Sequence, residues 1–458
     1  MVTILKNETV NESERLLSTI CEKTFLKLWA YPSVFRDEGK SKSGDGKEIC
    51  DFLVVFQKEI IIFSDKLIKF NKDKPTDVAW KRWEKRAITE SVSQLHGAQK
   101  WIREQTSRVF LDKKCTIKFP FFIDADISTF NIHLVAIANG LPDGKRLKIN
   151  SMGSPRKNFE VNFNTMKPFY HIFDTKAFEI ISKEMDTVDD FISYLKSREL
   201  LFIKGTPFYS CNEEDLLSEF ILKKDIINSV FSEKPISKKI PCNSYKRLIK
   251  ASDYKNGKIL DKDSYIWDSI IDMIATHIMD DSLLFDYEMS FDEQKMTIET
   301  MARYNRLDRR ALGIKIISKH RDTPPQHISS FSSPIDEHGF VYVIFPYSQF
   351  NPLDVSYDDY IKIREKILYS YCIHYSECYN ADVIGLIVDN HDLNLTKHTV
   401  KTTQIIFKKS VTTLYRKKQK TTEYETSIMD EMKKQFGILS SQRMNVYAEL
   451  HHQFPNKL

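Results

Sequence analysis

The first hundred residues alternate between helical and strand-like spacing of apolar side chains. Residues 13–29 repeat apolar positions at helical intervals, which predicts an amphipathic helix. Two short runs, 51–56 and 60–66, are apolar at almost every position, as expected for strands covered on both faces. Helical spacing returns in residues 78–109, where tryptophans supply several apolar positions. The pattern therefore predicts a helix, a hairpin of two buried strands and a second helix.

Further apolar runs continue this pattern through the first half of the chain. They predict strands at 115–123, 132–138 and 169–173, and helices at 175–184 and 188–200. Helices interspersed with strands in this way are typical of an α/β fold, here with a mixed sheet flanked by helices.

A polar segment divides the chain into two predicted domains. Residues 233–242 contain two prolines and three lysines, a composition typical of a linker. We therefore expect one α/β domain at 1–232 and a C-terminal α/β domain at 233–458. The second domain is predicted to contain helices at 266–277 and 291–313, a strand–helix–strand unit at 341–345, 358–375 and 382–388, a strand at 402–407, a basic run at 415–420 and a terminal helix.

Composition and motifs argue against several classes of protein. The chain has 458 residues, of which 41% are hydrophobic, enough to build packed cores. The 68 basic and 63 acidic residues give a net charge of +5, which is compatible with nucleic-acid binding without being diagnostic of it. The seven cysteines form no CxxC pair, so neither a structural zinc site nor a disulfide framework is indicated. The chain also lacks a P-loop, an HExxH motif and a GxSxG motif.

No segment has the character of a membrane span or a secretion signal. No apolar run approaches the roughly 18–20 residues that cross a bilayer. The N-terminus lacks a basic region followed by a long apolar core. We therefore expect a soluble cytoplasmic protein without membrane contact, and the pattern leaves room for a homo-oligomer or a partner protein.

Two charged residues stand at the ends of the predicted hairpin. Asp51 opens its first strand and Lys66 closes its second, and a charge at the end of a buried strand is costly unless it is compensated. A connection around Lys58 and Glu59 allows two pairing registers. In one register Asp51 lies opposite Lys66, and in the other it lies opposite Asp65. The register therefore decides which side chains share a face with Asp51.

An acid and a lysine at one end of a hairpin suit metal-dependent hydrolysis of phosphodiesters. Asp51 can bind Mg²⁺ (or Mn²⁺), which prefers oxygen ligands and needs only one or two protein carboxylates. Lys66 can orient the attacking water and offset charge in the transition state. Glu14 or Glu48 can supply a further acid, and Gln94 on the following helix can order a water or a phosphate. Each of these residues also has a structural interpretation, such as a strand-end cap, a helix-terminus acid or a solvated surface side chain.

This order of residues resembles the PD-(D/E)xK restriction-endonuclease-like superfamily over about the first 100 to 140 residues. The resemblance implies an N-terminal restriction-endonuclease-like mixed sheet flanked by helices. It also implies that Asp51 and Glu14 bind the metal and that Lys66 is the catalytic lysine, with Gln94 in support. The implied activity is that of a Mg²⁺-dependent endonuclease acting on nucleic acid, DNA rather than RNA, in a setting such as restriction or antiphage defence.

The chain departs from the superfamily at one position. The second acid is expected two residues before the lysine, where this chain has Ser64. Asp65 would supply that acid, as a metal ligand, only in the shifted register. The departure supports an alternative hypothesis, a catalytically inactive nuclease-like fold that acts as a nucleic-acid-binding or assembly module.

A second group of basic residues lies in the C-terminal half. Arg303, Arg306 and Arg310 fall on one face of the helix predicted at 291–313. Such a row can contact phosphates, but ion pairs with acids on the same helix explain it equally well. The basic run at 415–420 likewise suits nucleic acid or a solvated surface.

Overall fold

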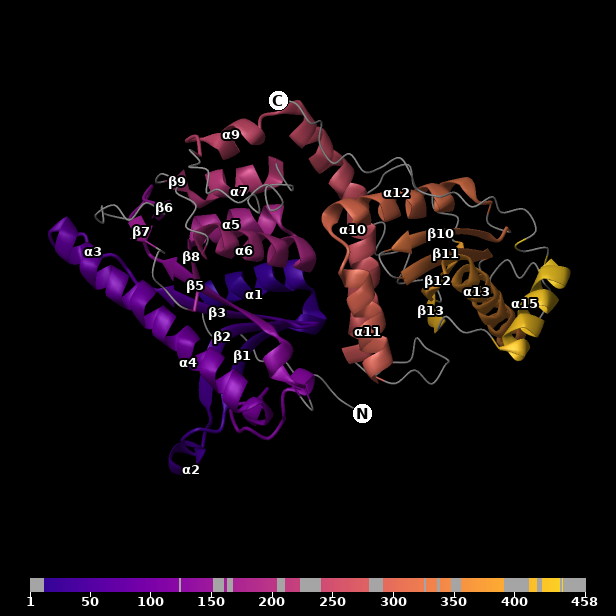
Figure 1. The fold of residues 1–458 in the computed structure, drawn as a ribbon, viewed down its shortest axis with the longest axis horizontal. Coiled ribbons are helices and arrows are strands. Elements are labelled where there is room, and N and C mark those ends of the chain that lie inside the picture. Colours follow the sequence, from indigo (N-terminus) through magenta and orange to yellow (C-terminus); the bar gives the residue numbers. More distant parts are fainter. Residues whose placement is uncertain are drawn as a thin grey trace. The chain divides into compact units, whose positions relative to one another are not determined.

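The structure is a computed structural model. It describes residues 12–122, 125–150, 160–162, 168–203, 211–222, 240–279, 291–324, 327–335, 338–346, 356–390, 412–417, 422–436 and 439. The chain divides into two compact units, Met1–Lys255 and Asn256–Leu458 (Figure 1). The boundary predicted between 232 and 233 lies outside the described residues.

The first unit is built around a six-stranded mixed sheet. Its strands are β1 (Ala30–Arg36), β2 (Lys47–Phe56), β3 (Glu59–Leu67), β4 (Val109–Phe110), β5 (Asn131–Asn139) and β8 (Tyr170–Asp174). Their spatial order is β4-β1-β2-β3-β5-β8. The strands β1, β2 and β3 form an antiparallel meander, whereas β5 runs parallel to β3 and β8 runs parallel to β5. The predicted mixed sheet is therefore confirmed.

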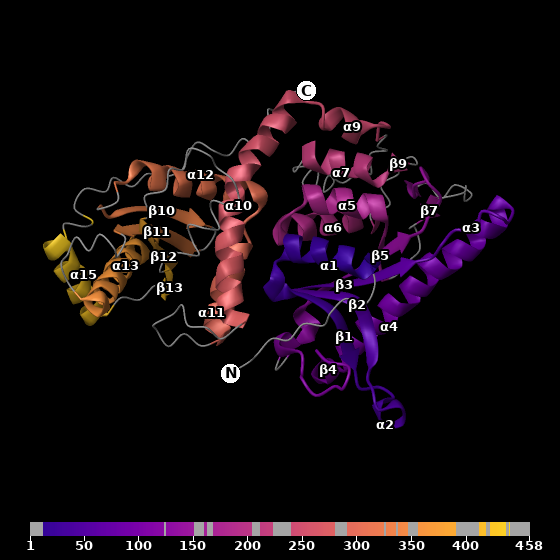
Figure 2. The same cartoon turned by 180° about the vertical axis from the view of Figure 1, so that it is seen from behind.

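Helices cover both faces of this sheet. The helices of the first unit are α1 (Glu12–Phe25), α2 (Lys40–Ser43), α3 (Thr76–Glu84), α4 (Glu90–Glu104), α5 (Thr175–Glu184), α6 (Val188–Ile203), α7 (Glu213–Leu222) and α9 (Ser244–Leu248). The views in Figures 1 and 2 show α1, α5 and α6 on one side of the sheet and α3 with α4 along the other. The ring of Phe63 on β3 packs against Phe25 of α1 and Phe178 of α5, with centroids 6.1 and 5.8 Å apart. A small separate sheet contains β6 (Lys148–Asn150), β7 (Glu160–Asn162) and β9 (Cys211–Asn212).

The turn of the β2–β3 hairpin lies at Gln57 and Lys58, one residue earlier than the connection predicted around Lys58 and Glu59. Phe52 pairs with Phe63 and Phe56 pairs with Glu59, so only two residues form the turn. The first of these, Gln57, has a φ of 53°, the left-handed conformation that such tight hairpins require. Both predicted registers are therefore wrong, because the observed one continues toward a pairing of Asp51 with Ser64.

Two other predictions for the first unit need correction. The strand β1 was not predicted, because Pro32 lacks an N–H group and argues against a central strand. Pro32 is tolerated because β4 pairs only with Phe35 and Arg36, so the proline lies beyond the end of that ladder.

The strand predicted at 115–123 is wrong as well. Asp112 accepts hydrogen bonds from the backbone N–H groups of Thr116 and Ile117, at 2.8 and 2.7 Å, and these bonds close a turn. Lys118 then forms an isolated bridge, and a 3-10 helix follows at Pro120–Phe122.

A π-helical turn, Lys85–Thr89, joins α3 to α4 without a break. A π turn contains more residues than an α turn, so it shifts the helical phase of α4 relative to α3. Before it, Trp80 and Trp83 are buried with stacked rings, and Trp83 Nε1 donates to the Asn139 carbonyl at 3.1 Å. After it, Leu95 is fully buried. The helix predicted at 78–109 is confirmed as far as Glu104.

The second unit contains a four-stranded sheet in the order β10-β11-β12-β13. Its helices are α10 (Ser252–Met279, which begins in the first unit), α11 (Phe291–Ala302), α12 (Arg306–Asp322), α13 (Tyr357–Tyr379) and α15 (Glu423–Phe436). Its strands are β10 (Ser329–Ile335), β11 (His338–Pro346), β12 (Asp382–Asn390) and β13 (Thr412–Lys417).

The predicted strand–helix–strand unit is confirmed, because β11 and β12 are parallel and α13 connects them. The strand predicted at 402–407 lies outside the described residues, as does part of the basic run. In the described part of the chain, no helix combines the length and the apolar character needed to cross a membrane.

The helix predicted at 291–313 is two helices. The Asn305 side chain accepts hydrogen bonds from the backbone N–H groups of Leu307 and Asp308, at 2.9 and 3.1 Å. This N-cap starts α12 as a separate helix.

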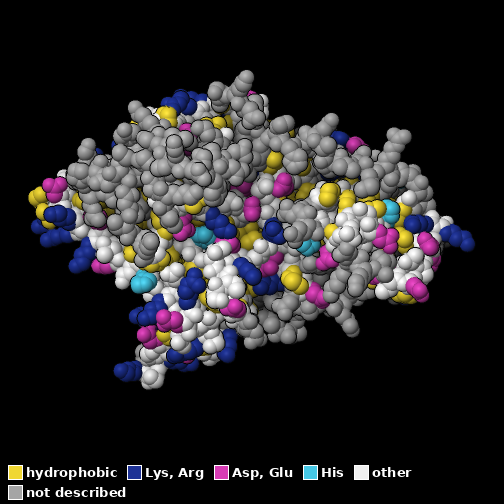
Figure 3. Space-filling view, viewed as in Figure 1, with side chains coloured by type: hydrophobic (Ala, Val, Ile, Leu, Met, Phe, Trp, Pro, Cys, Tyr) yellow, Lys and Arg dark blue, Asp and Glu magenta, His cyan; other side chains and the backbone are white. Residues whose placement is uncertain are grey.

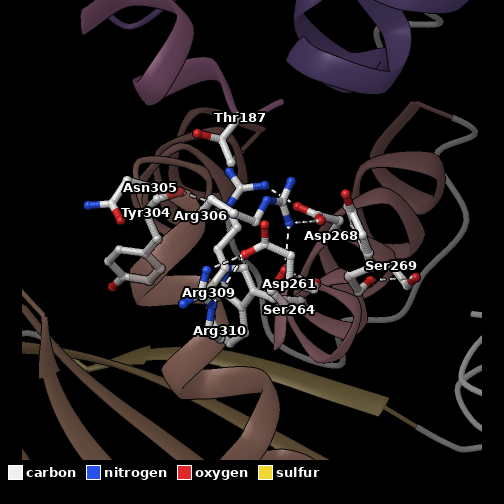
Figure 4. Close-up of polar contacts among 12 residues, drawn as sticks. Thr187, Asp261, Ser264, Asp268, Ser269, Tyr304, Asn305, Arg306, Arg309 and Arg310 are labelled. Carbon is white, nitrogen blue, oxygen red and sulfur yellow. Dashed lines mark hydrogen bonds and ion pairs between the residues drawn. The ribbon is translucent and has the colours of Figure 1, made fainter. Parts of the chain in front are cut away.

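Three arginines at the start of α12 bind to acids on α10 (Figure 4). Arg306 and Arg309 both form ion pairs with Asp268, and Arg310 Nη2 lies 2.6 Å from Asp261 Oδ1. Arg309 is almost completely buried. These contacts favour the ion-pair interpretation over phosphate binding, although the partners lie on a neighbouring helix.

Gly313 lets α12 approach α10 closely. A Cβ atom at this position would collide with the backbone carbonyl oxygen of Asp263. We expect Gly313→Ala to lower the free energy of unfolding of the second unit by about 1–3 kcal/mol. Gly257→Ala on α10 is the control, since its nearest new neighbour would be Arg310 Nη2 at 3.8 Å. That change should stabilise the unit by about 0.5–1 kcal/mol through helix propensity. Urea unfolding followed by circular dichroism measures both, and effects of equal sign would contradict the close approach.

Candidate active site

Asp51, Ser64 and Gln94 form a hydrogen-bonded group at the end of the β2–β3 hairpin. The Gln94 amide nitrogen donates to Asp51 Oδ1 at 3.4 Å, and Ser64 Oγ donates to the Gln94 amide oxygen at 3.1 Å. A carboxylate only accepts hydrogen bonds, so the amide must turn its nitrogen toward Asp51. The backbone N–H of Asp65 donates to the second Asp51 oxygen at 2.6 Å. Two of the predicted site residues, Asp51 and Gln94, are therefore hydrogen-bonded directly, and Ser64 binds the other end of the Gln94 amide.

Three carboxyl groups interact electrostatically at this site: those of Asp51, Glu14 on α1 and Glu48 on β2. Burial raises the pKa of Asp51, outweighing the opposing charge of Lys66 and its hydrogen bonds, and the charge of Glu14 adds to the rise. Glu48 is exposed as a residue, but protein atoms around its carboxyl group desolvate it. This desolvation raises the pKa of Glu48, and the charges of Asp51 and Glu14 contribute. A cation at this position would therefore be stabilising.

Lys66 is the cation that the structure itself provides here. It lies two residues after Ser64 on β3, so both side chains point to the same face of the sheet. Burial raises the pKa of Asp51 and is the larger effect, whereas the charge of Lys66 lowers that pKa. The Lys66 ammonium group must therefore lie near the Asp51 carboxyl group. Lys66 is partly exposed. The two residues are thus neighbours, although they are not directly opposite each other in the ladder.

The carboxyl groups do not form a closed cage. In the described part of the chain, the oxygens of Asp51, Glu14 and Glu48 are not all within 4.8 Å of one another. Mg²⁺ usually keeps several waters and takes one or two protein carboxylates. Asp51 with either glutamate is therefore a sufficient donor set for that ion.

Asp65 points to the other face of the sheet. Its carboxylate accepts a hydrogen bond from Asn139 Nδ2, and Asn139 accepts one from Thr175 at the start of α5. Burial raises the pKa of the Cys21 thiol on α1, and the charge of Asp65 adds to this effect. Asp65 therefore lies beside α1 and α5. The metal-ligand role predicted for Asp65 depended on the shifted register and has no support in this arrangement.

Ser64 is the residue whose part in the site the sequence did not reveal. The sequence pattern marks it only as the place of a missing acid, whereas it is fully buried and holds the Gln94 amide. A two-residue turn at Gln57 and Lys58 would have placed it opposite Asp51. That turn was the available signal, but neither residue is the glycine or asparagine that usually marks it.

Exposed basic side chains follow the helical segment that carries Gln94. They are Lys81, Arg82, Lys85, Arg86, Lys100 and Arg103. Figure 3 shows Lys and Arg side chains at the α3 end of the first unit and around α2, with acidic side chains among them. The surface is therefore mixed, with basic groups available to contact phosphates.

No protein-family profile, curated protein sequence or solved structure matches this chain.

The raised pKa of Asp51 leads to a prediction about stability. An acid whose pKa is higher in the folded state contributes stability below its ordinary pKa and loses it as the pH rises. Without added metal, Asp51→Asn should therefore be more stable than the wild type at neutral pH. The difference should shrink as the pH falls toward the ordinary carboxyl pKa of 3.8. Thermal unfolding across this range measures it.

Asp112 is the matched control. Its pKa is lowered despite some burial, because hydrogen bonds from Ile117 and Thr116 stabilise the carboxylate. Asp112→Asn should therefore destabilise the protein at neutral pH, with the difference shrinking in acid. A destabilising Asp51→Asn at neutral pH would contradict the electrostatics described for the site.

Proposed function

We propose that the first unit is a Mg²⁺-dependent nuclease that hydrolyses phosphodiester bonds of DNA. The observation that carries the proposal is the convergence of Asp51, Gln94 and the charge of Lys66 at one end of the sheet. The order of elements agrees with the resemblance to the PD-(D/E)xK superfamily. A helix with Glu14 precedes the strand with Asp51, and the strand with Lys66 near its end follows. The helical segment of α3 and α4 comes next, and α4 carries Gln94.

The donor set at this site fits a hard divalent cation. Asp51 and Glu14 would hold Mg²⁺ (or Mn²⁺), with Glu48 as the alternative second acid. When bound, the ion supplies a Lewis acid for the scissile phosphate. The half-buried Asp51 carboxylate, whose pKa is raised by burial, is a group that such a cation would stabilise.

The residues around Asp51 have distinct tasks in this proposal. Lys66 orients the attacking water and stabilises the negative charge that develops on the phosphate. Gln94 fixes the orientation of the Asp51 carboxylate through its amide nitrogen, and Ser64 fixes Gln94 in turn. The exposed basic residues of α3 and α4 would contact the DNA backbone without reading sequence. Restriction or antiphage defence is the setting that the resemblance suggests.

The alternative function is a nuclease-like module that binds nucleic acid or assembles with partners without cleaving. Ser64 favours it, because the acid that usually completes the metal site is replaced by a buried hydroxyl group. In this alternative the network of Asp51, Gln94 and Ser64 serves structure alone.

Cleavage of circular plasmid DNA by the full-length chain tests the proposal. We expect nicked or linear products with Mg²⁺ or Mn²⁺, none with a chelator, and none with Asp51→Ala. Salt-dependent DNA binding without cleavage in any metal would select the alternative function. Equal cleavage by the wild type and Asp51→Ala would reject this site.

A further inference from the structure

Two histidines and a glutamate meet on the side of the sheet opposite to Ser64. His133 lies on β5 and His171 on the parallel strand β8, whereas Glu199 lies on α6. One ligand atom from each residue lies within 4.8 Å of the other two. His133 and His171 are 4% and 0% exposed, and Glu199 is half-buried. Three groups able to bind a metal therefore converge at a largely buried position.

The orientation of His133 leaves one ring nitrogen without a partner. Its Nε2 atom lies 2.9 Å from a carboxylate oxygen of Glu59. A carboxylate accepts hydrogen bonds, so in the neutral ring Nε2 carries the proton and the lone pair is on Nδ1. The Nδ1 atom is buried and has no hydrogen-bond partner among the described residues. Lys196 and Asn131 hold the Glu59 carboxylate at 2.6 and 2.9 Å, so this orientation is fixed.

His171 also has a buried nitrogen without a partner in the described part of the chain, its Nε2 atom. Burial lowers the pKa of His171, and the positive charge of Arg198 lowers it further. The ring is therefore neutral at physiological pH, the form that binds metals. Arg198 Nη1 lies 3.4 Å from the Nδ1 atom, at the long limit of a hydrogen bond, and its guanidinium is held mainly by Glu213 at 2.7 and 3.0 Å. Metal on Nε2 moves the ring proton to Nδ1, so this long contact would open.

We propose that His133, His171 and Glu199 bind a divalent first-row transition metal such as Zn²⁺. Two imidazole nitrogens and one carboxylate are a donor set used by zinc and by non-haem iron, and such sites keep an open coordination position. The carboxylate–histidine contact between Glu59 and His133 is the support that metal-binding histidines almost always have.

The open coordination position would face a pocket of about 400 Å³. His133 and Glu199 line this pocket, and Arg103 and Lys196 lie in its wall. A small anion could therefore reach the metal with favourable electrostatics.

This site is separate from the one around Asp51. Glu59 is the first residue of β3 and Lys66 is close to its last, so the two sites lie at opposite ends of the strand. Their side chains also lie on opposite faces, since His133 is paired with Ile61 whereas Ser64 faces α4. The donors differ as well, because imidazole nitrogens suit transition metals and carboxylate oxygens suit Mg²⁺.

Titration of the full-length chain with Co²⁺, followed by visible absorption, tests this proposal together with Zn²⁺ content after dialysis. We expect one equivalent per chain in the wild type. Glu199→Gln, an isosteric change at a half-buried position, should weaken binding at least 10-fold. Glu59→Gln should weaken it by about 10- to 100-fold through the orientation of His133. His96→Gln, at an exposed histidine on α4, and Asp51→Asn should leave this binding unchanged.

The controls separate this proposal from the proposed nuclease. Loss of Co²⁺ binding in Asp51→Asn, with retention in Glu199→Gln, would assign the metal to the other site and overturn the inference. If the wild type does not bind one equivalent of Co²⁺ or Zn²⁺ tightly, the inference is overturned as well, whatever the result of the plasmid assay. Circular dichroism confirms folding of each variant, and if Glu59→Gln does not fold, Glu199→Gln decides the outcome.

Discussion

Replacing Lys66 with methionine is expected to lower the rate of Mg²⁺-dependent DNA cleavage by about 10²- to 10³-fold. Methionine preserves most of the apolar stem, so the strand end should still pack. The substitution removes the positive charge beside Asp51. In the proposed nuclease it also removes the donor that would orient the attacking water. DNA binding should change little, because the exposed basic residues of α3 and α4 are untouched. Single-turnover cleavage and salt-dependent binding measure the two effects separately.

Lys69→Met is the matched control for this change. Lys69 is exposed and follows β3 by two residues, so it shares the local charge environment without reaching the site. It should cleave DNA at the rate of the wild type. If Lys66→Met and Lys69→Met were equally active, Lys66 would have no catalytic task, and the resemblance to the nuclease superfamily would lose its most specific residue.

The largest expected effect on stability comes from Glu213→Gln. Arg198 is completely buried and forms two hydrogen bonds to Glu213, at 2.7 and 3.0 Å. The substitution keeps the shape of the side chain but removes the charge that compensates the guanidinium. Removing one partner of a buried ion pair typically costs about 3–5 kcal/mol. The rings of Phe173 and Phe202, at 4.9 and 5.0 Å from the guanidinium carbon, cannot replace a carboxylate.

Glu179→Gln supplies the comparison. Glu179 forms an exposed ion pair with Lys176 on α5, at 3.6 Å. Exposed pairs of this kind contribute less than about 1 kcal/mol, so the substitution should be close to neutral. Denaturant unfolding of both variants gives the difference. Similar free energies of unfolding for the two would mean that the charge of Arg198 is compensated by another group.

The sequence predicted the elements whose signals are local. The helix predicted at 175–184 coincides with α5, because Asp174 caps it by accepting a hydrogen bond from the Ala177 N–H at 2.8 Å. The continuous apolar runs likewise locate β3 and β5 to within a residue or two of their observed ends. Elements that depend on distant partners were missed. Pro32 is acceptable in β1 only because of where β4 ends, and no local pattern contains that information.

The candidate site was predictable in part for the same reason. Asp51 and Gln94 could be named because one opens a strand and the other lies on the next helix. The roles of Ser64 and Asp65 depend on a register set by the left-handed backbone of Gln57, which side-chain patterns do not encode. His133 and His171 lie on different strands within apolar runs, without the short spacing that marks a metal motif. Only the pairing of β5 with β8 brings them together.

The π turn between α3 and α4 affects which mutations this protein can accept during evolution. Each residue of an α-helix turns its successor by about 100°, so deleting one residue from Lys85–Thr89 would swing Gln94 away from Asp51 while Trp83 stayed anchored. A helix of uniform pitch would have a different phase at Gln94, so it could not keep both the Trp83 contact with Asn139 and the Gln94 contact with Asp51. The additional residue of the π turn sets the helical phase of α4 separately from that of α3. Substitutions around Trp83 therefore need not change the orientation of Gln94, and the reverse also holds.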